Sequence, residues 1–189
     1  MPFLKETLEF NKKFVEDKEY EAFDTNRFPD KKIAILSCMD TRLTGLLQAA
    51  LNLKNGDSKV IKNAGAVITQ PYGTVMRSLM IAIYELGIQE IFVIGHFDCG
   101  MQGLESAKII NKMIARGIPK EEIENVFNSG VDIHKWLTGF DDAETSVIET
   151  VKFIRTHPFV PKDVKIYGFM IDPKTGELHV LDDGTKNQK

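Results

Sequence analysis

The sequence has few cysteines, little net charge and no long apolar run. Its 189 residues carry a formal net charge of −3, which gives no basis for neutralising nucleic-acid phosphates or binding an anionic membrane. We therefore expect neither partner. The two cysteines, Cys38 and Cys99, could form a stabilising disulfide, but a protein of this size in a reducing compartment does not need one. Metal or redox chemistry is the alternative.

No segment is suited to crossing a membrane. The longest charge-free stretch, residues 63–76, is too short to span a bilayer and contains Asn, Gln, Pro and Gly. The first residues alternate charged and apolar side chains and so lack the apolar centre of a secretory signal. A cytoplasmic location is the resulting expectation.

The hydrophobic pattern predicts one α/β domain over residues 1–189. With 43% hydrophobic residues, the chain is long enough for one well-cored domain and short for two. Continuous apolar runs alternate with helix-like segments, which favours a mostly parallel central sheet flanked by helices on both faces. The predicted strands are 33–37, 59–62 and 91–94, and the predicted helices between them are 43–53 and 74–86.

The two ends of the chain add a helix and a hairpin. Residues 3–20 repeat apolar side chains at about a helical period, which predicts an amphipathic N-terminal helix whose apolar face needs a partner. The turn signal at 172–176 predicts an antiparallel C-terminal hairpin. Its strands are 164–171 and 177–181, and further helices are predicted over 101–116, 120–127, 131–137 and 142–155.

Polar side chains follow two of the predicted strands. If strands 33–37 and 91–94 are neighbours and 59–62 lies outside them, the strand order reverses there, and ligands bind at the carboxyl ends beside such a reversal. Both clusters would then converge at one site. The first cluster is Cys38, Asp40 and Arg42, and the second is His96, Asp98 and Cys99.

The cysteines and His96 have the chemistry of a metal site. His96 and Cys99 are spaced H-x-x-C, and Cys38 would reach the same point from the neighbouring strand. Two thiolates and one imidazole suit zinc, and three ligands leave a fourth position open, as in catalytic sites. Two alternatives remain open: a hydrogen-bonded strand-end histidine beside small buried cysteines, or thiol redox chemistry without metal.

Asp40 and Arg42 are spaced to form a bidentate ion pair. Such a pair would fix the carboxylate, which could then orient a zinc-bound water. A surface ion pair or a capping Asp is the alternative. Asp98 is either an acceptor near the metal or a solvated turn residue. A helix beginning directly after Gly100 would also point free N–H groups at the site and favour an anion there.

Taken in order, these motifs resemble the β-class carbonic anhydrases, and in particular their compact bacterial and archaeal members. The resemblance covers residues 33–103 and resumes at the C-terminal hairpin. One departure is Thr41, where Ser is commoner. The matching motifs are C-x-D-x-R at 38–42, N-A-G-A at 63–66, S-L-x-x-A-x-x-x-L-G at 78–87 and G-H-x-D-C-G at 95–100.

The resemblance implies a function and a set of roles. Zinc would be bound by Cys38, His96 and Cys99, and an Asp40–Arg42 dyad would orient the zinc-bound hydroxide. The reaction would be reversible hydration of carbon dioxide to bicarbonate and a proton. A homodimer or a larger dimer-based assembly is implied, in which helix 1–20 packs on the partner. In some members the matching Asp occupies the fourth zinc position at lower pH.

Two other functions stay open at this point. The same site could hydrolyse carbon disulfide or carbonyl sulfide, or the protein could be a non-catalytic zinc or bicarbonate-binding module. An intact Asp40–Arg42 pair counts against a purely structural zinc, because structural sites usually fill the fourth position with protein. The candidates for lining a small apolar cleft for carbon dioxide are Val67, Ile68, Tyr72 and Phe97.

Overall fold

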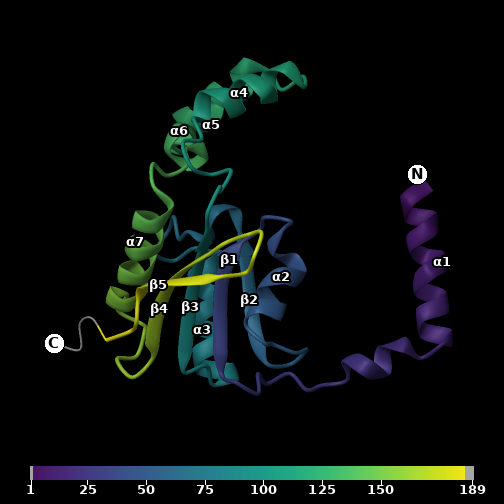
Figure 1. Ribbon diagram of the computed structural model, residues 1–189. Helices are drawn as coiled ribbons and strands as arrows, with labels where there is room; N and C mark the ends of the chain where they lie inside the picture. Colours follow the sequence, from purple (N-terminus) through teal and green to yellow (C-terminus); the bar gives the residue numbers. More distant parts are fainter. Residues whose placement is uncertain (1, 186–189) are drawn as a thin grey trace.

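A five-stranded sheet forms the centre of the computed structural model, which describes residues 2–185 (Figure 1). The strand order is β2-β1-β3-β4-β5. All neighbouring pairs are parallel except β4 with β5. The predicted parallel sheet with an antiparallel closing hairpin is therefore confirmed. The strands are β1 (Ile33–Cys38), β2 (Ser58–Asn63), β3 (Glu90–His96), β4 (Lys165–Ile171) and β5 (Leu178–Asp182).

Helices cover both faces of the sheet. On one face, α3 (Thr74–Leu86) and α7 (Ala143–Thr156) pack against the alternate strand residues Ala34, Ile91 and Val93. On the other face, α2 (Leu43–Ala50) packs against Ile35 and Ile94. Because β1 and β3 are buried on both faces, they are almost continuously apolar, as strands at the centre of a parallel sheet are.

Two helical parts extend away from the sheet. α1 (Pro2–Glu16) and the short η1 (Glu19–Phe23) lie apart from it, and α4 (Ser106–Ala115), α5 (Lys120–Asn128) and α6 (Ile133–Leu137) form an arm beyond one end of it (Figure 1). Across residues 2–185, none of the helices has the length and apolar character needed to cross a membrane. The predicted N-terminal helix is present as α1, and it exposes Phe3, Leu4, Leu8, Phe10 and Val15.

The prediction of a helix starting at Met101 is wrong, because α4 starts at Ser106. Residues 101–104 instead pair through their backbone with Gly139 and Phe140. Gly103 N–H donates to the carbonyl of Phe140 at 2.8 Å, and Gly139 N–H donates to that of Leu104 at 2.8 Å. This pairing takes the place of the first helical turn. We had expected a helix N-terminus directly after Gly100, but the next helix begins only at Ser106.

Candidate metal centre

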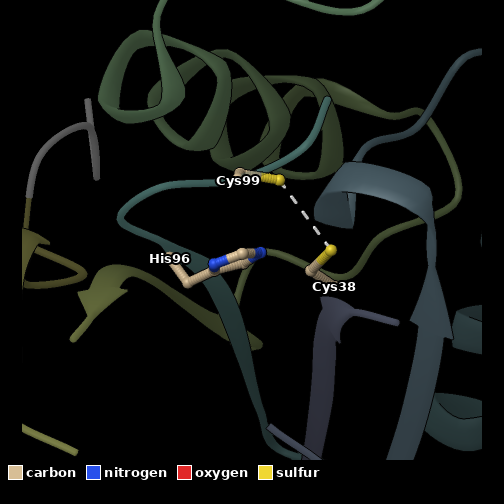
Figure 2. A group of neighbouring side chains, drawn as sticks. All are labelled: Cys38, His96 and Cys99. Carbon is tan, nitrogen blue, oxygen red and sulfur yellow. Dashed lines mark hydrogen bonds between the residues drawn. The ribbon is translucent and has the colours of Figure 1, made fainter. Parts of the chain in front are cut away.

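Cys38, His96 and Cys99 converge at the carboxyl ends of β1 and β3. Cys38 and His96 are the last residues of these two adjacent strands, and Cys99 lies in the turn that follows β3. One ligand atom from each residue lies within 4.8 Å of the other two, and all three side chains are buried. Figure 2 shows the two thiols pointing toward each other beside the ring of His96. The predicted convergence is confirmed.

The spacing of the sulfur atoms suits a shared metal ion. Cys38 Sγ and Cys99 Sγ lie 3.9 Å apart, and both cysteines are free. A tetrahedral zinc with Zn–S bonds of about 2.3 Å separates two sulfur ligands by about 3.8 Å. The thiols therefore already stand at the separation that such an ion requires, and the disulfide interpretation finds no support.

His96 directs an unpartnered nitrogen at the cluster. Its Nδ1 lies 2.9 Å from the carbonyl oxygen of Phe97, which can only accept, so Nδ1 carries the proton. The lone pair is then on Nε2, which is buried and has no hydrogen-bond partner among the described residues. A buried polar atom without a partner is costly. A metal ligated at Nε2 satisfies it, whereas the interpretation as an ordinary hydrogen-bonded histidine leaves it unsatisfied.

A backbone N–H supports the thiolate of Cys38. Gly65, in the single-turn helix η2 (Ala64–Ala66), donates to Cys38 Sγ at 3.4 Å. The side chain of Asn63 holds this turn, because its amide donates to the carbonyl of Val67 at 2.6 Å and accepts from Val67 N–H at 3.2 Å. The motif at 63–66 contributed to the family resemblance, but its N–H···S contact was not foreseen.

The two thiols differ in acidity. The hydrogen bond from the thiol of Cys99 lowers the pKa of Cys38 to about 4, and the N–H of Gly65 also lowers it. The pKa of Cys99 is raised, because its proton is held by Cys38 and because the group is buried. The cluster therefore presents one thiolate ready to bind a cation, and the second proton leaves when the ion binds.

Asp40 and Arg42 form the predicted bidentate pair beside the cluster. Arg42 Nε donates to Asp40 Oδ1 at 3.0 Å, and Arg42 Nη2 donates to Oδ2 at 2.9 Å. Oδ2 lies 3.8 Å from His96 Nε2, so the carboxylate faces the metal-binding group. Arg42 lowers the pKa of Asp40 to about 2, which keeps this group ionised.

Asp98 contacts Arg42 from the other side. Its carboxylate accepts from Arg42 Nη1 at 2.9 Å, and its backbone carbonyl accepts from Nη2 at 2.9 Å. The side chain is nevertheless 85% exposed. The sequence left open whether Asp98 is an acceptor or a solvated turn residue, and in the structure it is both.

A cavity of about 500 Å³ lies next to η2. Val67 and Ile68 line it, together with Met101 of the turn after Cys99 and Trp136 of α6. Of the four residues predicted to line an apolar cleft, Val67 and Ile68 thus line this cavity. Tyr72 is 72% exposed and Phe97 packs against the main core, and neither is among the residues that line the cavity.

The fold and this donor set together define a class of protein. A buried group of two thiols and one imidazole, at the carboxyl ends of a sheet where the strand order reverses, is typical of a metal-dependent enzyme. Residues 33–178 match the family described as carbonic anhydrase. The chain belongs to this family and, within it, to the β-class carbonic anhydrases.

Known proteins resemble the chain over most of its length. YtiB of Bacillus subtilis (strain 168) is 52% identical over 187 residues, covering 99% of this chain and 100% of YtiB. Carbon disulfide hydrolase of Acidithiobacillus thiooxidans is 29% identical over 158 residues, covering 79% and 76%. The crystal structure of β-carbonic anhydrase isoform I from Trichomonas vaginalis has a TM-score of 0.89 and 35% identity, covering 97% of this chain and 100% of that one.

Proposed function

We propose that the protein hydrates carbon dioxide reversibly to bicarbonate and a proton, with zinc held by Cys38, His96 and Cys99. One observation carries this proposal: a buried imidazole nitrogen, for which residues 2–185 offer no hydrogen-bond partner, lies beside two free thiols 3.9 Å apart. The family membership supports the same function. Zinc bound by three protein ligands supplies a water of lowered pKa as the source of the nucleophile.

Asp40 has the role of orienting the attacking water. Its Oδ2 faces the metal-binding group, and the carboxylate stays ionised because Arg42 lowers its pKa to about 2. An ionised carboxylate at this point accepts a hydrogen bond from the water. This contact directs a lone pair of the water oxygen at the substrate. Arg42 holds both oxygens of Asp40, the arrangement that the family resemblance associates with an open site.

The neighbouring cavity suits the substrate. Carbon dioxide is apolar and carries no hydrogen-bond donor, so a site for it needs mainly dry apolar walls. Val67, Ile68 and Met101 supply apolar walls to this cavity, and they follow closely after Gly65 and Cys99 in the chain. We infer that carbon dioxide approaches the metal centre from this side.

The carbon disulfide hydrolase among the relatives favours a second candidate substrate. Carbon disulfide is a linear apolar molecule with an electrophilic carbon, as carbon dioxide is, so the same nucleophile could attack it. Release of hydrogen sulfide from carbon disulfide, measured on the same preparation, distinguishes the two. Hydration of carbon dioxide without sulfide release supports the first function.

We also infer that the chain is one domain and that α1 packs on a second copy of it. α1 exposes Phe3, Leu8 and Phe10 with 78%, 60% and 64% of their surface accessible, and it lies apart from the sheet (Figure 1). In sedimentation velocity the protein should run as a dimer or a larger assembly, and Leu8→Lys should shift it toward the monomer. Glu9→Gln, on the opposite face of the same helix, is the control. A monomeric parent would contradict this inference.

The decisive experiment is stopped-flow hydration of carbon dioxide by the parent, Asp40→Ala and Asp163→Ala. Positioned general bases contribute about 10²–10⁴-fold in rate, so Asp40→Ala should lose about that much of kcat/KM. Asp163 is an exposed Asp remote from the site motifs, and Asp163→Ala should retain parental activity. A parent that binds zinc but hydrates no carbon dioxide would be the non-catalytic module that the sequence left open.

A further inference from the structure

We propose that Asp98 is a positioning residue, whose carboxylate and backbone carbonyl hold the guanidinium of Arg42 so that Arg42 can present Asp40 to the metal centre. Its effect on catalysis rests on the proposed function, whereas the contact itself does not. Asp98 lies between two of the metal-binding residues in sequence, and its carboxylate accepts a hydrogen bond from Arg42.

The contacts account for most of the hydrogen-bonding capacity of Arg42. A guanidinium has five N–H donors in a fixed plane. Nε and one N–H of Nη2 donate to Asp40, and a further contact from Nη2 reaches the carbonyl of Asp98 at 2.9 Å. Nη1 donates to the Asp98 carboxylate at 2.9 Å. The group is thus held along two edges, and no other side chain among residues 2–185 accepts from it.

The backbone of Asp98 explains how one residue makes two of these contacts. Its φ is +55°, in the left-handed region, which Asn and Asp adopt more readily than other non-glycine residues. In this conformation the carbonyl and the carboxylate of Asp98 both reach Arg42. A residue in the ordinary β or α region would direct its carbonyl elsewhere.

A weak surface ion pair is the competing interpretation, because the Asp98 side chain is 85% exposed. Exposed pairs of this kind usually contribute little to stability. The geometry points to a different role, because both contacts of Asp98 restrict rotation of a guanidinium whose other edge is bound to Asp40. Asp98 acts by orienting Arg42. Its removal should therefore change the rotation of the Arg42 guanidinium and the rate of carbon dioxide hydration, with little change in the free energy of unfolding.

The first test uses the metal-free full-length protein and does not depend on activity. Rotation of the Arg42 guanidinium about its Cζ–Nε bond exchanges Nη1 with Nη2 and is measured by ¹⁵N NMR. In Asp98→Ala the rotation should become about tenfold faster, as expected for the loss of one charge-assisted hydrogen bond. Asp98→Asn keeps an acceptor oxygen and tolerates the same φ, so it should restore slow rotation. Equal rates in the parent and Asp98→Ala would overturn the proposal.

The second test is a double-mutant cycle in carbon dioxide hydration. If Asp98 acts through Arg42, Asp98→Ala should lower kcat/KM about three- to tenfold in the parent and leave the Arg42→Ala variant unchanged. Zinc affinity, measured by competition with a chelating dye, should stay at the parental value. Equal losses in both backgrounds, or a large fall in zinc affinity, would show that Asp98 shapes the turn between His96 and Cys99 instead. A parent without hydration activity refutes the proposed function, while the NMR test still decides the role of Asp98.

Discussion

Replacing Gly65 by Ala should destabilise the protein at the metal centre itself. The residue has φ +86°, and a Cβ there would lie 2.9 Å from Cε1 of Phe140 and 3.2 Å from Cγ of Met101. The left-handed backbone costs a non-glycine residue about 1–2 kcal/mol, and overpacking of this kind costs about 1–3 kcal/mol. The more restricted unfolded chain returns about 0.4–1 kcal/mol. We expect a net loss of about 2–4 kcal/mol in the free energy of unfolding.

Chemical denaturation of the metal-free protein measures this loss, with Gly100→Ala as the matched control. Gly100 adjoins Cys99, but a Cβ at this position would have no neighbouring atom within 4 Å, and the φ of Gly100 is not in the left-handed region. Gly100→Ala should therefore stay within about 0.5 kcal/mol of the parent. If both variants lost the same stability, the close packing of η2 against Phe140 and Met101 would not be the cause, and this account of Gly65 would be refuted.

Three further predictions concern pH, metal and a remote ion pair. The hydration rate should rise from neutral to alkaline pH, because two thiolates cancel much of the zinc charge and leave its water less acidic; a maximum below neutrality would contradict this. Asp40, with its pKa lowered to about 2, stays ionised throughout and should add no step to the profile. Adding zinc to the metal-free protein should raise its Tm in calorimetry, since a ligand that binds the folded state stabilises it, and His96→Ala should reduce this rise. Asp182→Ala should lower the free energy of unfolding by about 3–5 kcal/mol, as measured by chemical denaturation. Asp182 holds the largely buried Arg155 by two contacts of 2.9 and 3.1 Å. A loss below about 1 kcal/mol would refute this prediction.

The sheet and the convergence of the three metal-binding residues could be predicted from sequence. The strands at the centre of the sheet are buried on both faces, so their apolar runs are continuous and easy to identify. Cys38 and His96 end two of these strands, and the parallel pairing of β1 with β3 brings the two ends together. The site follows from the strand order once β2 is placed outside β1.

The region after Cys99 could not be predicted in the same way. The helical pattern from Met101 onward is a local signal, whereas the pairing of residues 101–104 with Gly139 and Phe140 joins segments far apart in the chain. Such tertiary contacts override local propensity. Sequence periodicity therefore misplaced the start of α4 and, with it, the expected helix N-terminus at the site.

The supporting contacts of the site were also hidden from sequence. Gly65 donates through its backbone N–H, which every non-proline residue possesses, so its residue type does not reveal the contact to Cys38. An Asp in a turn is usually a solvated residue, and the exposed side chain of Asp98 fits that description although it also contacts Arg42. The positive φ of Asp98 is visible only in three dimensions. In this conformation the backbone carbonyl of Asp98 accepts a hydrogen bond from Arg42.

Zinc K-edge X-ray absorption of the purified protein shows whether Cys38, His96 and Cys99 bind one zinc ion together. We predict a bound zinc with two sulfur neighbours at about 2.3 Å and one imidazole nitrogen at about 2.0 Å. In Cys99→Ser the spectrum should lose one of the two sulfur neighbours. A zinc shell made only of oxygen and nitrogen, or a protein that binds no zinc while both thiols stay free, would contradict this prediction.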